Sequence, residues 1–260
     1  VWVNGPIREL PPRWCSGGFQ PLHVHIHEGL ERIGVEAFYE CTVLNEVLLP
    51  EGLKHIERLA FGKDRFFEKL VLPESLETMG ESVFHGCSGF EELTVPGFLR
   101  EIPDSTFHSC FGIRELTLSE GIEKIGRFAF SGCRKISRLQ MPSTVKEIGG
   151  SAFEGCGSLR EVRLNDGIKK LGAGCFARCV ELTELNFPDG IEEIGGMAFE
   201  HCLKLADEDL NIIRGGVFYA HAGTRSEIEI FAKSSQPAAV TQVASGAFAE
   251  NDRIRKIFIG

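Results

Sequence analysis

The sequence predicts a repeat solenoid of the α/β type, in which 23-residue coils place a parallel β-sheet on one face and short turns or helical turns on the other. Three observations support this prediction: apolar pairs return at one fixed spacing, prolines often follow these pairs, and an Ala-Phe dipeptide followed by a cysteine recurs between them. A fixed period of roughly 20 to 50 residues is typical of repeat arrays, whose coils bury their apolar sides only by stacking. The chain of 260 residues is therefore expected to form one elongated domain.

Each coil is expected to contribute one strand, because two apolar residues alternate with polar ones and would turn inward from the same face. These pairs are Val1/Val3, Val24/Ile26, Val47/Leu49, Leu70/Leu72, Leu93/Val95, Leu116/Leu118, Leu139/Met141, Val162/Leu164 and Leu185/Phe187. Proline cannot donate a ladder hydrogen bond, so it marks the end of the strand. It follows the pair at Pro50, Pro73, Pro96, Pro142 and Pro188.

Opposite the strand, the spacing from Ala152 and Phe153 to Cys156 matches one helical turn, which predicts a tight turn or a single turn of helix. Stacking would gather the repeated phenylalanines into one buried spine at the spacing of neighbouring strands, about 5 Å. The spine residues are Phe38, Phe61, Phe84, Phe107, Phe130, Phe153, Phe176 and Phe199. The glycine that follows the repeated isoleucine, as in Gly149, is expected to allow close packing rather than a positive φ, because Pro103 occupies the same position.

The regular repeats are expected over residues 30–205, within a single solenoid domain of residues 1–260. Irregular early coils are expected over 1–29 and irregular C-terminal repeats over 206–260, where the spacing is first compressed and then stretched. This change indicates a bend or a cap with a different stacking angle. The sequence begins and ends in the middle of a repeat, so it is expected to be part of a longer polypeptide.

Charge and cysteine usage narrow the class of protein. The net charge of −9 is spread along the array, which disfavours a nucleic-acid partner because such partners need a basic footprint. No apolar run approaches the roughly 18 residues of a membrane span, so no membrane insertion is expected. Seven of the nine cysteines, namely Cys41, Cys87, Cys110, Cys133, Cys156, Cys179 and Cys202, share one repeat position. They are interpreted, with Cys175, as buried apolar fillers, which favours an intracellular reducing compartment.

The outward residues of the strands form the broadest surface on which a partner could bind. The candidate residues are Glu46, Leu48, Lys69, Val71, Glu92, Glu115, Arg138, Glu161, Arg163 and Glu184. One interpretation is a solvated face on which Lys69, Arg138 and Arg163 neutralise glutamates of adjacent strands. The other is a binding strip, with Leu48 and Val71 as an apolar patch at its amino-terminal end.

Metal binding and catalysis find little support in the sequence. His23, His25 and His27 would project to one side of a strand, and a His-x-His pair can bind zinc. Three histidines in line span too far to close on one ion, and no acid or cysteine is placed to complete the site, so solvent-exposed histidines are the simpler interpretation. No glycine-rich phosphate loop follows a strand. No catalytic residue, cofactor or metal site is predicted.

The complete template, Leu-x-x-Ile-Gly-x-x-Ala-Phe-x-x-Cys-x-x-Leu-x-x-Leu-x-Leu-Pro, resembles the BspA-type leucine-rich repeats, closely over residues 30–205. The chain departs from this template at Asp64, which replaces the cysteine, and at Glu57 and Pro103, which replace the glycine. The resemblance implies a curved, right-handed leucine-rich repeat superhelix that binds macromolecules and has no catalytic residues. Because such repeats occur in bacterial surface proteins, it also allows a location at the cell surface.

Two functions follow from this resemblance and the exposed strand face. The first is a non-enzymatic interaction or scaffold module that binds a protein through its concave strand face or its ends. The second is a structural subunit or domain embedded permanently in a larger assembly. The first predicts a stable, soluble domain in isolation, and the second predicts end-to-end association.

Overall fold

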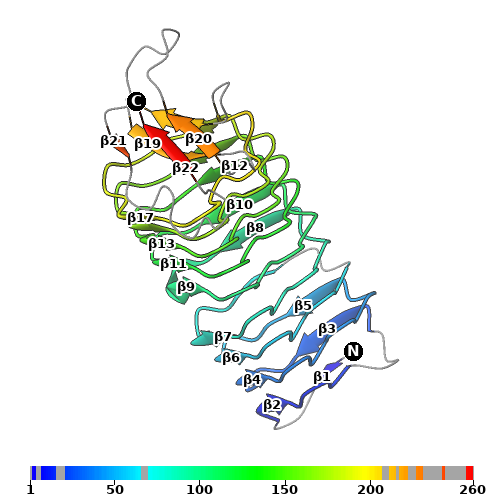
Figure 1. The fold of residues 1–260 in the computed structure, drawn as a ribbon. Coiled ribbons are helices and arrows are strands. Elements are labelled where there is room, and N and C mark those ends of the chain that lie inside the picture. The colour runs from blue at the N-terminus through cyan, green and yellow to red at the C-terminus, as the bar shows by residue number, and fades with distance from the viewer. Residues whose placement is uncertain are drawn as a thin grey trace.

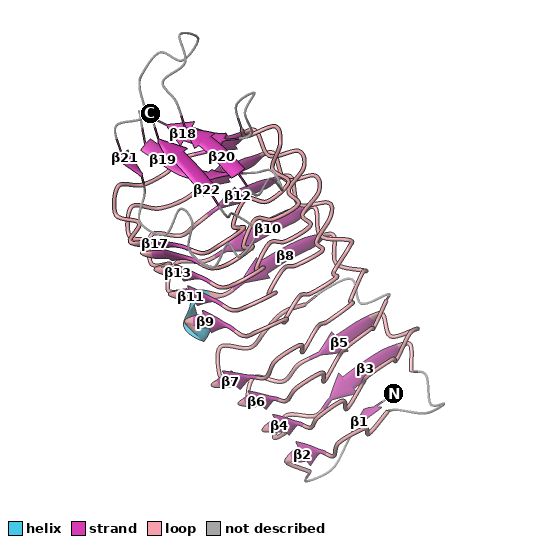
Figure 2. Cartoon of the chain, in the orientation of Figure 1, coloured by secondary structure: helices cyan, strands magenta, loops and turns pink. Residues whose placement is uncertain are grey.

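The repeats form coils that lie side by side along one axis in the computed structural model (Figure 1). Each coil contributes to three faces, which are a sheet of longer strands, a sheet of two-residue strands and a row of turns (Figure 2). The structure describes residues 2–3, 7–15, 21–65, 70–206, 211–214, 217–221, 227–230, 242–243 and 256–259.

The first face is the long-strand sheet. The strand predicted at Leu70/Leu72 does not form, and the sheet contains the strands predicted at the other eight apolar pairs. These are β1 (Trp2–Val3), β3 (His23–Ile26), β5 (Glu46–Leu48), β8 (Glu92–Val95), β10 (Glu115–Leu118), β12 (Arg138–Gln140), β14 (Glu161–Arg163) and β16 (Glu184–Leu185). Neighbouring strands pair in parallel at the repeat spacing, for example Leu116 beside Leu93, so that the apolar side of one coil covers that of the next. Among the described residues the pairing forms three segments, β1-β3-β5, β8-β10 and β12-β14-β16.

The second face is a short-strand sheet that the sequence analysis did not anticipate. Its strands are β2 (Glu9–Leu10), β4 (Arg32–Ile33), β6 (His55–Ile56), β7 (Thr78–Met79), β9 (Glu101–Ile102), β11 (Lys124–Ile125), β13 (Glu147–Ile148), β15 (Lys170–Leu171) and β17 (Glu193–Ile194). Each contains the apolar residue at the isoleucine position of the template, which is buried except for the half-buried Met79, and the polar residue before it, which is at least partly exposed. This sheet is parallel and forms two segments, β2-β4-β6-β7 and β9-β11-β13-β15-β17.

On the third face, the Ala-Phe segments form short turns, so of the two predicted alternatives the turn is confirmed. Two residues in each of these turns have a positive φ, for example Ser151 at 53° and Gly155 at 69°, which interrupts helical geometry. The N–H of Cys156 donates to the carbonyl of Phe153 within the turn, while the N–H of Phe153 donates to the next coil at 2.8 Å. In the described part of the chain the one helical element is the 3-10 turn η1 (Gly97–Leu99).

The core runs along the whole array and is centred on the predicted phenylalanine spine. All eight spine rings are fully buried. Successive rings stack almost in parallel, with centroid separations from 5.0 Å for Phe38 and Phe61 to 5.9 Å for Phe176 and Phe199. The separation predicted from strand spacing is therefore confirmed.

Close packing of coils explains the repeated glycine. The structure gives no positive φ at Gly34, Gly126 or Gly149, as predicted. A Cβ added to Gly149 would lie 2.7 Å from the carbonyl carbon of Gly126 in the preceding coil. Backbone atoms cannot move away from such a contact without separating the coils.

We therefore expect Gly149→Ala to destabilise the fold by about 2 kcal/mol or more, because the added methyl group overpacks two backbones. Urea unfolding followed by circular dichroism would measure the change. Gly52→Ala is the matched control, because a Cβ there meets no atom within 4 Å. Equal effects of the two substitutions would contradict the packing explanation.

The array changes its pattern after residue 206. β18 (Asn211–Arg214) pairs with β19 (Val217–His221) in an antiparallel hairpin, in which Ile213 lies beside Phe218. β19 pairs in parallel with β21 (Gln242–Val243), and β20 (Glu227–Ile230) pairs in parallel with β22 (Lys256–Ile259). The single domain of residues 1–260 stays a prediction.

Candidate interaction surface

The predicted candidate residues that the structure describes lie along the outward side of the long-strand sheet and its connections. Those of the strands are Glu46, Leu48, Glu92, Glu115, Arg138, Glu161, Arg163 and Glu184. Val71 lies in the coil between β5 and β8, and Lys69 lies outside the described residues. These outward residues differ from one another in how far their charges are neutralised.

The carboxy-terminal part of this surface neutralises itself. Arg138 Nε lies 3.6 Å from the carboxylate of Glu161, and Arg163 Nε lies 2.8 Å from the same carboxylate. The guanidinium of Arg163 also lies 3.3 Å from Glu184. This confirms the predicted pairing for both arginines. Exposed pairs of this kind contribute about 1 kcal/mol or less each, so this network fits a solvated face.

The middle of the surface carries unneutralised charge. Glu92 and Glu115 are exposed and lie directly beside each other in the register of β8 and β10. Neither carboxylate forms an ion pair with any residue that the structure describes. Like charges placed side by side on neighbouring strands are destabilising. The charges of these two glutamates are therefore not neutralised by the part of the chain that the structure describes.

The amino-terminal part of the surface is apolar. The side chain of Leu48 is 51% exposed and that of Val71 is 79% exposed, although both are large and aliphatic. They occupy equivalent positions in consecutive coils. These two side chains form an exposed apolar patch next to the acidic residues. Patches of this kind can mark a protein interface.

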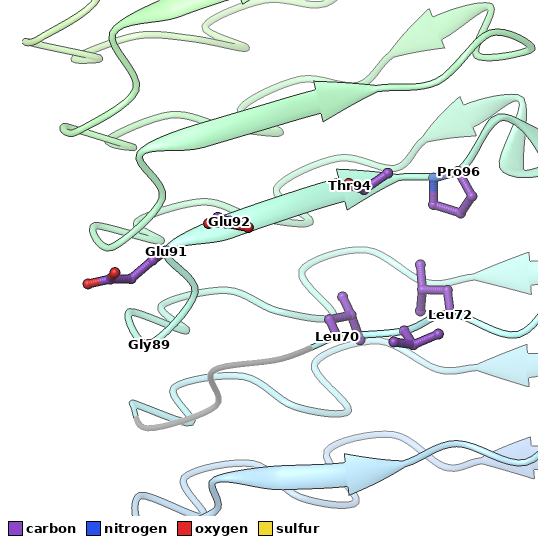
Figure 3. Close-up of a pocket in the computed structure, with 8 residues that line it drawn as sticks. Leu70, Leu72, Gly89, Glu91, Glu92, Thr94 and Pro96 are labelled. Atoms are coloured by element: carbon purple, nitrogen blue, oxygen red, sulfur yellow. The ribbon is translucent and has the colours of Figure 1, made fainter.

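A cavity of about 840 Å³ opens where the apolar and acidic parts meet (Figure 3). One wall is formed by Leu70, Val71 and Leu72 and the other by residues around β8, including Glu92 and Thr94. The sequence analysis named Val71 and Glu92 but did not predict that they line one cavity. A regular parallel sheet would have closed this space.

The three histidines do not form part of a metal site in the structure. His23 and His25 lie on β3, and His23 and His27 are exposed. Among the residues with described side chains, no three His, Cys, Asp or Glu side chains are arranged to hold a metal ion.

The cysteines are core residues, as predicted. All nine are unpaired and buried. In the regular coils the thiol donates to the carbonyl of a spine phenylalanine in the preceding coil, as from Cys133 to Phe107 at 3.2 Å. Burial raises the pKa of Cys156 to about 12, so its thiol stays protonated and unreactive at neutral pH.

We expect iodoacetamide to modify none of the described cysteines in the native protein, because neither thiolate nor access is present. Mass spectrometry before and after addition of urea would measure labelling, with all nine thiols reacting once the chain unfolds. Rapid labelling of Cys156 or Cys175 in the native protein would contradict this prediction.

Asp64 replaces one cysteine of this row and is the exception within it. Its side chain is completely buried, and neither carboxylate oxygen accepts a hydrogen bond of normal geometry from the described residues. Burial raises the pKa of Asp64 to about 10, an effect that the backbone N–H of Cys41 opposes. The carboxyl group is therefore neutral at physiological pH.

Comparison with protein families matches the model of the BspA type leucine rich repeat region, in six copies over residues 20–120 and 100–222. The chain belongs to this family. Leucine-rich repeats of this type usually act as surface or interaction modules and are typically non-enzymatic. Comparison with curated proteins finds no match.

Several solved structures of bacterial proteins are similar to this chain. A leucine-rich repeat protein of T. pallidum is 25% identical, with 78% of this chain and 73% of that chain covered and a TM-score of 0.40. A leucine rich cell surface protein of Faecalibacterium prausnitzii A2-165 is 20% identical. The match covers 97% of this chain and 76% of that chain, with a TM-score of 0.46. The pneumococcal vaccine antigen PcpA is 18% identical. The match covers 92% of this chain and 71% of that chain, with a TM-score of 0.49.

No helix among the described residues is long and apolar enough to cross a membrane.

Proposed function

We propose that this chain is a non-enzymatic interaction module that binds a protein partner through the outward side of its long-strand sheet. The observation that carries this proposal is the unneutralised pair of Glu92 and Glu115 on an exposed face. On β14 and β16 of the same face, Glu161 and Glu184 are paired with arginines of the chain itself. A face that serves only as a solvated surface would be expected to pair Glu92 and Glu115 with cations of the chain as well.

The partner is expected to present lysine or arginine side chains next to aliphatic ones. Positive charge complements Glu92 and Glu115, while aliphatic side chains would cover Leu48 and Val71. Complementary charge mainly accelerates association and selects partners, and buried apolar area contributes affinity. Nucleic acid does not fit this surface, because its phosphates would be repelled by the glutamates.

A charge-reversal pair tests the proposal. Proteins captured from extracts of the source cells by the unaltered chain would be compared with those captured by the double variant Glu92→Lys/Glu115→Lys. We expect the double variant to lose its specific partner, because four units of charge change at the contact. The unaltered chain should lose the same partner progressively as salt is added.

Asp166→Lys/Asp189→Lys is the matched control. These two exposed aspartates also occupy equivalent positions in adjacent coils, but they lie at the corner after the strand. The control should retain the partner. Unchanged capture by both double variants would remove the strand face as the binding surface.

A further inference from the structure

Among the described residues both sheets are interrupted in the same region: no strand pairs with β8 on the side of residues 70–72, and β7 does not pair with β9. No backbone hydrogen bond joins residues 70–80 to residues 91–103, both of which the structure describes. The turn face remains continuous there, because the N–H of Phe84 donates to the carbonyl of Thr106 at 2.9 Å and the rings of Phe84 and Phe107 lie 5.4 Å apart. The two coils are thus joined along their turns and separated at their sheets (Figure 1).

A residue of the chain explains the interruption of the short-strand sheet. In other coils the residue after the isoleucine donates its N–H to the preceding coil, as Gly126 does to Ile102 at 2.8 Å. Pro103 occupies this position and has no N–H to donate. The ring of Pro103 also occupies space at a position where the glycine of other coils lets the backbone of the preceding coil approach closely.

The interruption leaves β8 without a strand partner among the described residues on the side of residues 70–72, which do not themselves form a strand. The N–H groups of Arg114 and Ser119 donate to the carbonyls of Glu91 and Val95, so alternate residues of β8 bond toward β10. The backbone groups of the residues between them, including Thr94, must point the other way, because bonding alternates along a parallel strand. They face the cavity, opposite residues 70–72. Unpaired edges of this kind are templates for a further strand.

We propose that this cavity binds one extended segment of a partner protein as an inserted parallel strand. The inserted backbone would bond on one side to β8 and on the other to residues 70–72. Its side chains would alternate between the core side, beside Leu72, and the outer side, beside Val71 and Glu92. The matching segment has aliphatic residues on its inner side and lysine or arginine on its outer side. Strand addition gains affinity from main-chain hydrogen bonds and specificity from alternate side chains.

This inference rests on the proposed function and specifies the site within the strand face. It also explains the composition of the two walls. An inserted segment would cover Val71, whose side chain is otherwise 79% exposed, and its cations would compensate the repulsion between Glu92 and Glu115.

A synthetic peptide of four Lys-Val repeats, capped at both ends and labelled with a fluorophore, is the probe. Fluorescence anisotropy with the whole chain should show saturable binding, and a peptide of four Glu-Val repeats should bind at least about tenfold more weakly. Two N-methylated peptides, one modified only at its lysines and one only at its valines, should each lose binding, because insertion uses both edges of the added strand. Loss with only one of them would show addition to a single edge and would overturn the insertion.

Variants of the chain locate the binding. Val71→Lys should weaken the peptide affinity at least about tenfold, whereas Gln140→Lys, at the equivalent outward position of β12, should leave it unchanged. Pro103→Gly should weaken binding as well, because it restores the N–H that closes the short-strand sheet. Hydrogen exchange of the unliganded variants would show that each remains folded, and it should detect new protection of Thr94 in Pro103→Gly.

Three further results would overturn the proposal: no binding of the Lys-Val peptide, equal binding of the Glu-Val peptide, or no effect of Val71→Lys. A dimer in light scattering that Val71→Lys dissociates would assign the cavity to a second copy of the chain instead of a foreign segment. The proposed function fails separately, if the Glu92→Lys/Glu115→Lys variant keeps its captured partner.

Discussion

Replacement of Asp64 by cysteine is expected to stabilise the protein, and the gain should increase with pH. The substitution restores the residue that this position carries in the other regular coils. It removes a buried carboxyl group that has no hydrogen-bond partner among the described residues. Leaving a buried polar group unsatisfied costs about 1 to 3 kcal/mol even when it is neutral.

The pH dependence follows from proton uptake on folding. The pKa of Asp64 is about 10 in the folded chain, against 3.8 for an aspartate in water. Between these two values the folded state holds a proton that the unfolded state has released, so the free energy of unfolding falls by about 1.4 kcal/mol for each pH unit. The penalty is absent below pH 3.8 and is of order 4 kcal/mol at pH 7.

Urea unfolding at pH 5, 7 and 9 measures this difference between Asp64→Cys and the unaltered chain. Asp64→Asn separates the effect of ionisation from the effect of side-chain size, because the amide cannot ionise but is nearly as large as the carboxyl group. It should lose most of the pH dependence, so that its stability gain over the unaltered chain is smaller at pH 5 than at pH 7. A stability gain for Asp64→Cys that is the same at all three pH values would show that the carboxyl group ionises freely in the folded protein.

The sequence was sufficient to predict the features that repeat. A spacing shared by nine apolar pairs determines which residues face inward, and so also which residues, such as Glu92 and Glu115, lie on the outer side. The pairing of Arg138 and Arg163 with glutamates follows from the same register. Each of these features depends only on the average geometry of a coil.

Features that depend on a departure from the repeat were missed. Pro103 was used in the sequence analysis to explain the role of a glycine, but its missing N–H also interrupts a sheet that the pattern had not indicated. The short-strand sheet itself was overlooked, because a two-residue strand such as Lys124–Ile125 is too short to show alternation. The cavity combines both effects, since it exists only where neighbouring coils fail to pair.

Truncation of a spine phenylalanine is expected to have the second large effect. Phe153 is fully buried, and its ring lies 5.3 Å from that of Phe130 and 5.5 Å from that of Phe176. Phe153→Ala removes contacts to both neighbouring coils and leaves a cavity, at a cost of about 3 to 5 kcal/mol. Because each coil of a solenoid contacts only the coils beside it, the loss weakens two interfaces at once.

Urea unfolding would measure this loss, and hydrogen exchange would locate it. Phe128→Ala is the matched control, because Phe128 is 38% exposed and lies in the coil before Phe153. The control should cost far less. In Phe153→Ala, faster exchange should appear first at the turn amides of Phe153 and Phe130, which donate to the following coil, and should decline with distance along the array. Uniform acceleration across all coils would contradict nearest-neighbour coupling, because it would mean that the array unfolds only as a whole.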